Sequence, residues 1–251
     1  MAKKIISLSN QKIINYSKLK SSKYRSETGL FIVEGFKALE DIIENNITIR
    51  DILITNEDAL KGIKLSEHIN VSIVPQAVIK KVSGTDSPPK IITIAEQISG
   101  KIADFLSFNR IILLENISDP GNLGTIIRDT AAFGFDGIIL TGNCVDIYNP
   151  KVIRSSAGNF FKVPIIKTDR LTAEFKDFKL YTTYLHSTNS VTSDKLTPSD
   201  KFILSFGSEA SGLSEEFMKN SYKNVIIRTQ NVESLNIATS AAILMYEFSK
   251  H

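Results

Sequence analysis

The clearest pattern along the chain lies between residues 111 and 142: an apolar run, a polar stretch, a helical repeat and a second apolar run. Ile111–Leu114 is continuously apolar, which is typical of a strand buried on both faces. Asp119–Gly124 is rich in turn-forming residues, and Thr125 is placed to cap a helix that runs to Phe133. Ile138–Leu140 is a second buried strand. The polar loop thus follows the carboxyl end of a strand, where open α/β sheets bind ligands.

The rest of the second half also alternates between strand and helix patterns. The elements that we predict there span residues 151–156, 162–166, 171–175, 180–185, 202–206, 215–220, 224–227 and 234–250. This alternation predicts an α/β architecture with a mostly parallel sheet.

The first half predicts a smaller α/β unit. Strands are expected at 31–33, 52–55, 71–74 and 91–95, and helices at 35–44 and 76–82. The first of these helices should turn Phe36, Leu39, Ile42 and Ile43 inward. A turn-rich break covers 83–90, and 99–109 resembles a linker with a helical turn. We therefore divide the chain into domains at 1–105 and 106–251.

Composition narrows the class of protein only modestly. The 251 residues are 42% hydrophobic and 23% charged, with a net charge of +3, which describes a globular chain compatible with nucleic acid. One cysteine, Cys144, excludes an internal disulfide and a cysteine metal cluster, and fits a reducing cytoplasm. No apolar run reaches transmembrane length.

A basic segment near the amino terminus has two interpretations. Its cations are interleaved with tyrosines: Tyr16, Lys18, Lys20, Lys23, Tyr24 and Arg25. The segment is either an arm that contacts nucleic-acid phosphates or a solvated first helix, and the residues alone leave both open.

Three polar loops follow predicted strands and are the candidates for chemistry. They are Asp119–Gly124 with Arg128 beyond it, residues 206–213 (FGSEASGL) and residues 228–236 (RTQNVESLN). Each also has a structural explanation, because Gly shapes turns and Ser or Asn begins helices.

Common catalytic and phosphate-binding motifs do not explain these loops. The chain has no GxxxxGK[ST], and Gly121 and Gly124 are too close for GxGxxG. Ser208 lacks the second glycine of a nucleophile elbow. The three histidines have no metal-ligand spacing: His68, His186 and His251. We therefore expect neither a metal site nor a His-based hydrolase.

Taken together, the loops resemble a known family. The segments ENISDPGNLGTIIRDTAAFG, NPKVIRSSAGNFFKVPI, LSFGSEASGLS and ESLNIATSAAILMYEF are similar to those of the SpoU (TrmH-like) RNA ribose 2′-O-methyltransferases of the SPOUT superfamily. The resemblance covers about 110–250. It extends more weakly to 27–98, where FIVEGFKALEDII and SGTDSPPKIITIA look like the family's L7Ae/L30e-like substrate-binding domain.

The resemblance implies a fold, a cofactor and a set of site residues. The fold is a parallel-sheet domain with a deep trefoil knot near its carboxyl end, preceded by the small α/β substrate-binding domain. The cofactor is S-adenosyl-L-methionine, without a metal, and the active site forms at the interface of a homodimer. The family's catalytic residues fall on Asn122, Arg128, Glu209, Ser234 and Asn236, and its cofactor-binding residues on Thr183, Gly207, Ile227 and Leu235.

Roles for these residues follow from the implied reaction. Arg128 is a poor base because guanidinium stays charged, so we expect it to clamp a phosphate and stabilise alkoxide charge. Asn122 and Glu209 would orient Arg128 and the ribose, and Ser234 and Asn236 would hold the substrate phosphate or the knot loop. Gly207 would let the backbone approach the cofactor.

Two positions depart from the family pattern. The segment after Ile227 is one residue shorter than usual, which puts the geometry of the cofactor loop in question, and Asp129 replaces the usual Thr.

The resemblance leaves the substrate open. A separate amino-terminal domain favours RNA of the large ribosomal subunit, 23S rRNA, over tRNA, although a tRNA ribose 2′-O-methyltransferase is an alternative. A non-catalytic RNA-binding ribosome-assembly factor is a third interpretation. The presence of all five catalytic-motif residues argues against it.

Overall fold

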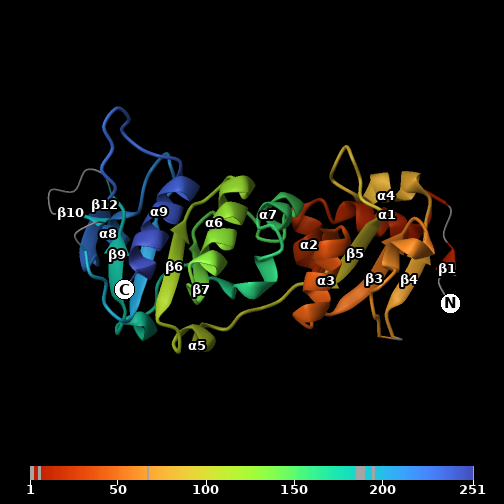
Figure 1. The fold of residues 1–251 in the computed structure, drawn as a ribbon, viewed down its shortest axis with the longest axis horizontal. Coiled ribbons are helices and arrows are strands. Elements are labelled where there is room, and N and C mark those ends of the chain that lie inside the picture. Colours follow the sequence, from red (N-terminus) through yellow and green to blue (C-terminus); the bar gives the residue numbers. More distant parts are fainter. Residues whose placement is uncertain (1–2, 5–6, 67, 185–189, 194–195, 251) are drawn as a thin grey trace. The chain divides into compact units, whose positions relative to one another are not determined.

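The chain divides into two compact units (Figure 1). The computed structural model describes residues 3–4, 7–66, 68–184, 190–193 and 196–250. The first unit comprises 1–98 and 146–154, and the second comprises 99–145 and 155–251. Helix α5 (Ile102–Phe105) buries Phe105 in the core of the second unit, so the units separate at Ile98 and not at 105. The sequence did not predict that 146–154 returns to the first unit.

The first unit is a five-stranded mixed sheet with helices on both faces (Figure 1). The sheet order is β1-β4-β3-β5-β2, parallel from β1 to β3 and antiparallel from β3 to β2. The strands are β1 (Lys3–Lys4), β2 (Leu30–Glu34), β3 (Ile49–Ile54), β4 (Asn70–Ile73) and β5 (Ile91–Glu96). The helices are α1 (Gln11–Lys18), α2 (Ser22–Thr28), α3 (Phe36–Glu44), η1 (Glu57–Leu60), α4 (Gln76–Val82) and α7 (Pro150–Ser155), whose last residue belongs to the second unit.

Alternate strand residues fill two separate cores in this unit. Ile92 and Ile94 face α1 and α4, whereas Ile52 and Ile54 face α3. In α3, Leu39 and Ile42 are fully buried as predicted. Phe36 is 41% exposed, which corrects the sequence prediction. Phe36 is the first residue of the helix, and the buried face begins one turn later.

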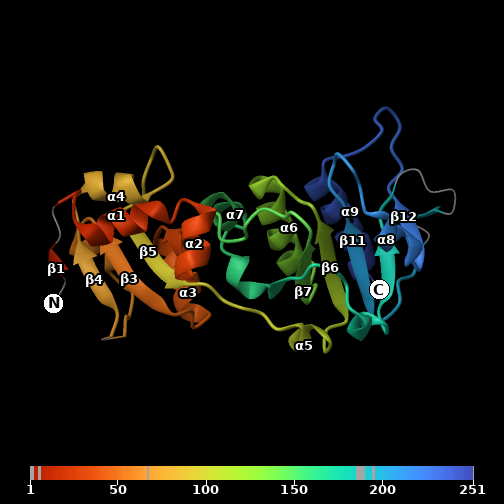
Figure 2. The ribbon, with the colours of Figure 1, turned by 180° about the vertical axis from the view of Figure 1, so that it is seen from behind.

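The second unit is a seven-stranded, entirely parallel sheet in the order β10-β12-β9-β11-β6-β7-β8 (Figure 2). The strands are β6 (Arg110–Glu115), β7 (Gly137–Thr141), β8 (Ile165–Lys167), β9 (Lys179–Thr182), β10 (Ser190–Thr192), β11 (Phe202–Phe206) and β12 (Lys223–Ile226). From β6 the chain adds β7 and β8 on one side, and it adds the other four strands on the opposite side. This reversal of strand order creates the kind of edge where α/β sheets bind ligands.

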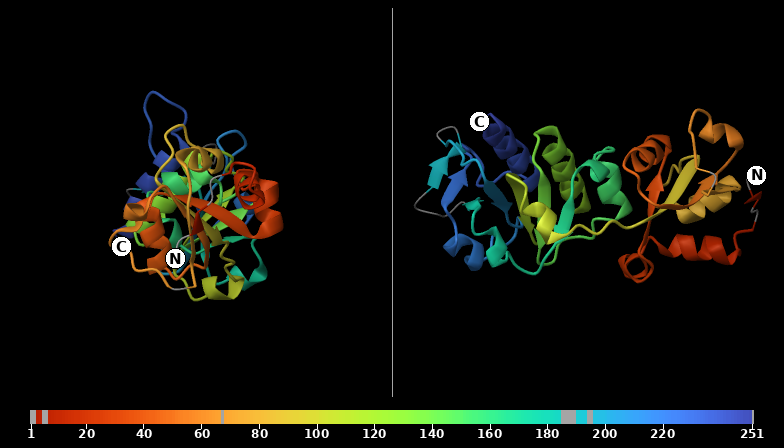
Figure 3. Two further views of the ribbon diagram at one scale, coloured as in Figure 1. Left: turned by 90° about the vertical axis from the view of Figure 1, so that its right-hand side faces the viewer. Right: turned by 90° about the horizontal axis from the view of Figure 1, so that it is seen from below.

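Helices cover both faces of the second sheet, which explains its continuously apolar strands. Helices α6 (Pro120–Ala132) and α9 (Ile237–Ser249) lie side by side (Figure 3), and Phe248 of α9 packs on Phe202 with ring centroids 5.2 Å apart. The opposite face packs against α5, η3 (Ala173–Phe175) and α8 (Glu215–Lys219). A further 3-10 turn, η2 (Phe160–Lys162), precedes β8.

Two helices start at residues other than the predicted ones. Helix α6 begins at Pro120 because the Asp119 side chain accepts a hydrogen bond from the backbone N–H of Asn122. Thr125 is therefore inside the helix. Helix α9 begins at Ile237 and not at residue 234, and it is capped by Asn236. Strand β10 was not predicted, and Leu185, the predicted end of the 180–185 strand, lies outside the described residues.

The basic amino-terminal segment forms two helices over 11–28, and its cations divide into two groups. Lys18, Lys20 and Lys23 are exposed. Arg25 is only 1% exposed and forms an ion pair with Asp146. Arg25 is therefore a structural residue. The sequence pattern had grouped it with the exposed cations.

Candidate active site

The three polar loops emerge from the carboxyl ends of β6, β11 and β12, and two of these strands, β6 and β11, are adjacent. Because all strands of the sheet are parallel, these ends share one edge. The first loop leads into α6, the second into α8 and the third into α9. The topology therefore gathers side chains that are far apart in sequence.

Asn122, Glu209 and Asn236 form one hydrogen-bonded network across the three loops. The side-chain amide of Asn122 donates to Glu209 Oε1 at 3.1 Å. The side-chain amide of Asn236 donates to Asn122 Oδ1 at 3.1 Å and to Glu209 Oε1 at 3.3 Å. The backbone N–H of Ile237 also donates to Glu209 Oε1, at 3.4 Å. One carboxylate oxygen thus accepts three N–H groups, which fixes Glu209 at the meeting point of the loops.

The helix caps place both asparagines in this network. Asn122 lies in the first turn of α6 because the helix starts at Pro120. Asn236 Oδ1 accepts from the backbone N–H groups of Ala238 and Thr239, at 2.9 and 3.4 Å. With its oxygen engaged as a cap, the Asn236 amide nitrogen is directed at Glu209 and Asn122. Asn236 therefore has two roles at once, one structural and one in the site.

A cavity of about 350 Å³ lies beside this network, between the second and third loops. All four residues predicted to bind the cofactor line it: Thr183, Gly207, Ile227 and Leu235. Glu209 and Ser234 line it as well, so the network and the cavity are continuous through Glu209. Two carboxylates face the cavity, those of Glu209 and Glu233, and none of the described residues that line it is Lys, Arg or His.

The backbone of its own loop constrains Gly207, in addition to the cofactor approach that the sequence predicts. A Cβ at this position would lie 2.0 Å from the backbone carbon of Gly212 and 2.2 Å from the backbone nitrogen of Leu213. The loop folds back on itself here, with a bridge between Ser208 and Gly212. The missing side chain therefore accommodates the loop's own backbone.

Two buried polar residues that the sequence analysis did not single out support the cavity. Asn224 in β12 bonds both backbone groups of Tyr184, accepting from its N–H at 2.8 Å and donating to its carbonyl at 2.7 Å. Glu115 at the end of β6 accepts from the backbone N–H of Ser214 at 2.7 Å and anchors the far end of the second loop. The sequence offered one signal for these two residues: each is the single polar residue of a predicted strand, Asn224 at the start of 224–227 and Glu115 at the end of 111–115.

Arg128 is the one predicted site residue that neither joins the network nor lines the cavity. It lies in the third turn of α6, because the helix starts at Pro120. Six residues separate it from Asn122, which places it about 120° around the helix from that residue. Arg128 is exposed. The neighbouring Asp129 is half-buried, and burial raises the pKa of its carboxyl, although the charge of Arg128 lowers it.

The part of the chain that the structure describes contains neither a metal-binding cluster nor a membrane-spanning helix. Within that part of the chain, no group of three or more His, Cys, Asp and Glu side chains is arranged to hold a metal ion. His68 is exposed, and His186 and His251 lie outside the described residues. The described helices include none that is long and apolar enough to span a membrane.

Comparison with known proteins identifies the family. The sequence profile of the SpoU rRNA Methylase family matches residues 109–246, and that of the MRM3-like substrate binding domain matches residues 10–93. The chain belongs to the SpoU rRNA methylase family. This confirms the family that the loop motifs predicted, and it makes the chain a methyltransferase. The second match identifies the first unit as a substrate-binding domain.

SpoU relatives resemble the chain over nearly its whole length. The Bacillus subtilis 23S rRNA (guanosine(2553)-2′-O)-methyltransferase RlmP is 30% identical, with 97% of this chain and 98% of that protein covered. The crystal structure of an AdoMet-bound rRNA methyltransferase from Sinorhizobium meliloti superposes with a TM-score of 0.89 at 27% identity, covering 100% and 98% of the two chains. The SpoU methyltransferase AviRb from Streptomyces viridochromogenes shares the fold, with a TM-score of 0.84 at 22% identity and coverage of 96% and 97%. The predicted parallel-sheet α/β fold with an amino-terminal substrate-binding domain is thereby confirmed.

Proposed function

We propose that the chain transfers a methyl group from S-adenosylmethionine to a ribose 2′-hydroxyl of 23S rRNA. The observation that carries this proposal is the continuity of the cavity with the Asn122–Glu209–Asn236 network. It places a cofactor-sized space next to polar groups that can orient a hydroxyl. The name of the B. subtilis relative gives 2′-O-methylation of 23S rRNA, and the S. meliloti relative is an AdoMet-bound rRNA methyltransferase.

The lining of the cavity suits S-adenosylmethionine. Apolar side chains such as Phe206, Leu235 and Leu244 fit the adenine ring, and the carboxylates of Glu209 and Glu233 complement a cofactor that carries two positive groups. When bound, S-adenosylmethionine supplies a methyl carbon that its sulfonium already makes electrophilic. The protein's task is then to orient the ribose oxygen and promote loss of its proton.

The site residues divide this task. Glu209 and Asn122 orient the ribose, because their positions are set by hydrogen bonds from two helices. Ser234, exposed at the cavity, binds a substrate phosphate, and Asn236, whose amide donates to Asn122 and Glu209, holds those two side chains in place. Arg128 clamps a neighbouring phosphate and stabilises the negative charge that develops on the ribose oxygen.

We propose that the active form is a homodimer, with the knot that the resemblance implies. Within one chain Arg128 lies on a different face of α6 from Asn122. A dimer lets Arg128 of the partner subunit complete the site. The exposed aromatic Tyr246 on α9, beside Phe133 at the end of α6, supports an interface on this pair of helices.

We propose ribosomal RNA as the substrate in preference to tRNA. We also propose that the enzyme acts in the cytoplasm. The separate first unit matches a substrate-binding domain and spans nearly a hundred residues that a minimal methyltransferase would lack. The single thiol, Cys144, is consistent with the cytoplasm, where ribosomal RNA is found.

The test uses the purified full chain with tritiated S-adenosylmethionine and unmodified 23S rRNA, 16S rRNA and tRNA as separate substrates. We expect incorporation into 23S rRNA, and alkaline hydrolysis should leave the label in dinucleotides, because a 2′-O-methyl group blocks cleavage. Label recovered in mononucleotides would indicate base methylation and contradict the proposal. Incorporation into tRNA alone would contradict the ribosomal substrate.

A further inference from the structure

Residues 146–154 follow β7 in the chain but pack within the first unit. Tyr148 anchors the segment, accepting from the backbone N–H of Ile98 at 2.6 Å and donating to the Ile98 carbonyl at 2.7 Å. Its ring packs on Phe31 with centroids 4.7 Å apart. Burial raises the pKa of the Tyr148 hydroxyl to about 12. A piece of the methyltransferase half of the sequence is thus an integral part of the substrate-binding unit.

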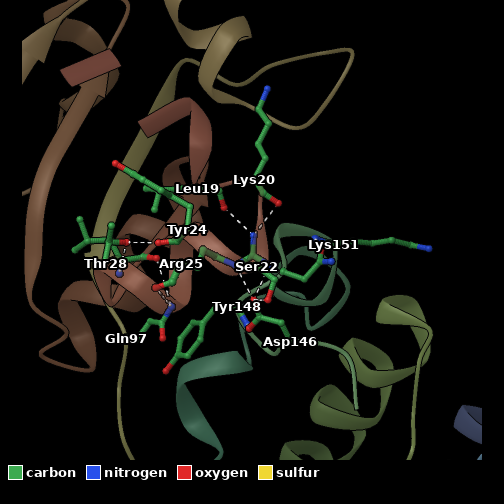
Figure 4. A network of polar contacts seen from close by, with 12 residues as sticks. Leu19, Lys20, Ser22, Tyr24, Arg25, Thr28, Gln97, Asp146, Tyr148 and Lys151 are labelled. Carbon is green, nitrogen blue, oxygen red and sulfur yellow. Dashed lines mark hydrogen bonds and ion pairs between the residues drawn. The ribbon is translucent and has the colours of Figure 1, made fainter. Parts of the chain in front are cut away.

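Arg25 and Asp146 form the polar centre of this arrangement (Figure 4). Arg25 donates from Nε and Nη2 to Asp146 Oδ2, at 2.7 and 2.6 Å. Its Nη1 donates to the carbonyl oxygens of Leu19 and Lys20, at 2.7 and 2.9 Å. A buried guanidinium is costly unless it is paired in this way. The Arg25–Asp146 pair therefore joins the turn after α1 to the segment 146–154.

The Arg25–Asp146 pair fixes the backbone that carries several exposed lysines. Lys20, whose carbonyl binds Arg25, is exposed, as are Lys18 and Lys23 on either side. Lys151 is exposed in α7, which directly follows the segment's anchor. Figure 4 shows the side chains of Lys20 and Lys151 extending away from the buried pair. Arg25 neutralises Asp146, and the exposed Glu27 lies 3.9 Å from Lys23, so the exposed lysines outnumber the carboxylate paired with them and the net outward charge is positive.

We propose that Lys18, Lys20, Lys23 and Lys151 form one RNA-binding surface on the first unit, and that the buried Arg25–Asp146 pair positions it. The ligand is the phosphate backbone of the RNA substrate, for which flexible lysines act as point charges. The inference rests on the proposed function. It adds that the RNA-binding surface is composite, with one part supplied by a segment that belongs in sequence to the methyltransferase half.

The first experiment measures filter binding of the full chain to transcribed 23S rRNA between 50 and 300 mM KCl. The variant is Lys20→Ala with Lys151→Ala, and the matched control is Lys61→Ala with Lys64→Ala, two exposed lysines of the same unit. We expect the first pair to weaken binding about tenfold or more and to lower the salt slope by about 1.5, for two lost phosphate contacts. Binding within twofold of wild type, or an equal loss in the control, would overturn the proposal.

The second experiment tests the positioning role through Asp146→Asn. This change removes a negative charge, so a surface that acts by charge alone would bind RNA as tightly or more tightly. The positioning role predicts weaker binding, seen as a raised KM for RNA with kcat unchanged. Binding as tight as wild type would overturn the positioning role. If this variant has a much lower melting temperature, the lysine variants still test the surface, because exposed lysines contribute little to stability.

Failure of this proposal can be told from failure of the proposed function. If the wild-type chain methylates 23S rRNA and the Lys20 and Lys151 variant binds it normally, only the RNA-binding surface is wrong. If the wild-type chain neither binds S-adenosylmethionine nor transfers label, the proposed function itself is wrong.

Discussion

At the scale of single residues, Arg128 carries the proposed chemistry without contributing to the fold. We expect Arg128→Ala to reduce methyl transfer by about 10²–10³ or more, because it removes a charge that stabilises the transition state. Cofactor affinity should stay within about twofold, since the cavity is lined by other residues. Arg128→Lys should restore little, because an ammonium cannot reproduce the bidentate geometry. Tritiated methyl transfer, cofactor calorimetry and melting temperature measure these effects. Activity within threefold of wild type would make Arg128 an ordinary surface residue.

Gly207 is the residue whose replacement should damage the cavity most directly. A Cβ there would meet the backbone of Gly212 at 2.0 Å, so Gly207→Ala must displace the loop. We expect at least a tenfold loss of S-adenosylmethionine affinity and a loss of stability of about 1–3 kcal/mol. The matched control is Gly84→Ala, where a Cβ would meet open space. Calorimetry on both variants decides the matter, and unchanged affinity in Gly207→Ala would show that the loop is not part of the cofactor site.

At the scale of elements, Asn236 at the start of α9 both caps the helix and bonds the site residues Asn122 and Glu209. Two different substitutions of Asn236 can separate these roles. Asn236→Ser keeps a capping oxygen but removes the amide that donates to Asn122 and Glu209. We expect its melting temperature to stay near that of wild type while methyl transfer falls at least tenfold. Asn236→Ala loses the cap as well and should cost about 1 kcal/mol more. Full activity of the serine variant would mean that Asn236 acts only as a cap.

At the scale of the whole molecule, a homodimer with Arg128 acting in trans predicts complementation. Arg128→Ala and Glu209→Ala should each be inactive alone. A heterodimer formed by co-expressing the two, each with its own affinity tag, contains one site with Glu209 intact in one protomer and Arg128 intact in its partner. Recovery of up to half the wild-type activity after tandem purification is the expected result. An inactive heterodimer would place Arg128 and Glu209 of the same chain in one site, and a monomeric mass by light scattering with full activity would exclude the dimer.

The amino-acid sequence by itself indicated the family, the α/β alternation and the residues, Arg128 excepted, that the fold gathers at the candidate site. These follow from short motifs, because a strand, its polar loop and the next helix are contiguous in the chain. Even so, the starts of α6 and α9 were misplaced, because several Ser, Thr, Asp and Asn residues stood near each start and only the folded backbone selects the capping one.

Only the tertiary structure decided the roles that depend on distant partners. Arg25 matched the pattern of a solvated cation, and it is buried because Asp146, 121 residues away, neutralises it. Gly207 is constrained by a loop that folds back onto its own backbone. Residues 146–154 leave the sheet that precedes them and complete the other unit. A local pattern records which side chains are polar, whereas the free energy of burying a charge depends on a partner that the fold brings into contact.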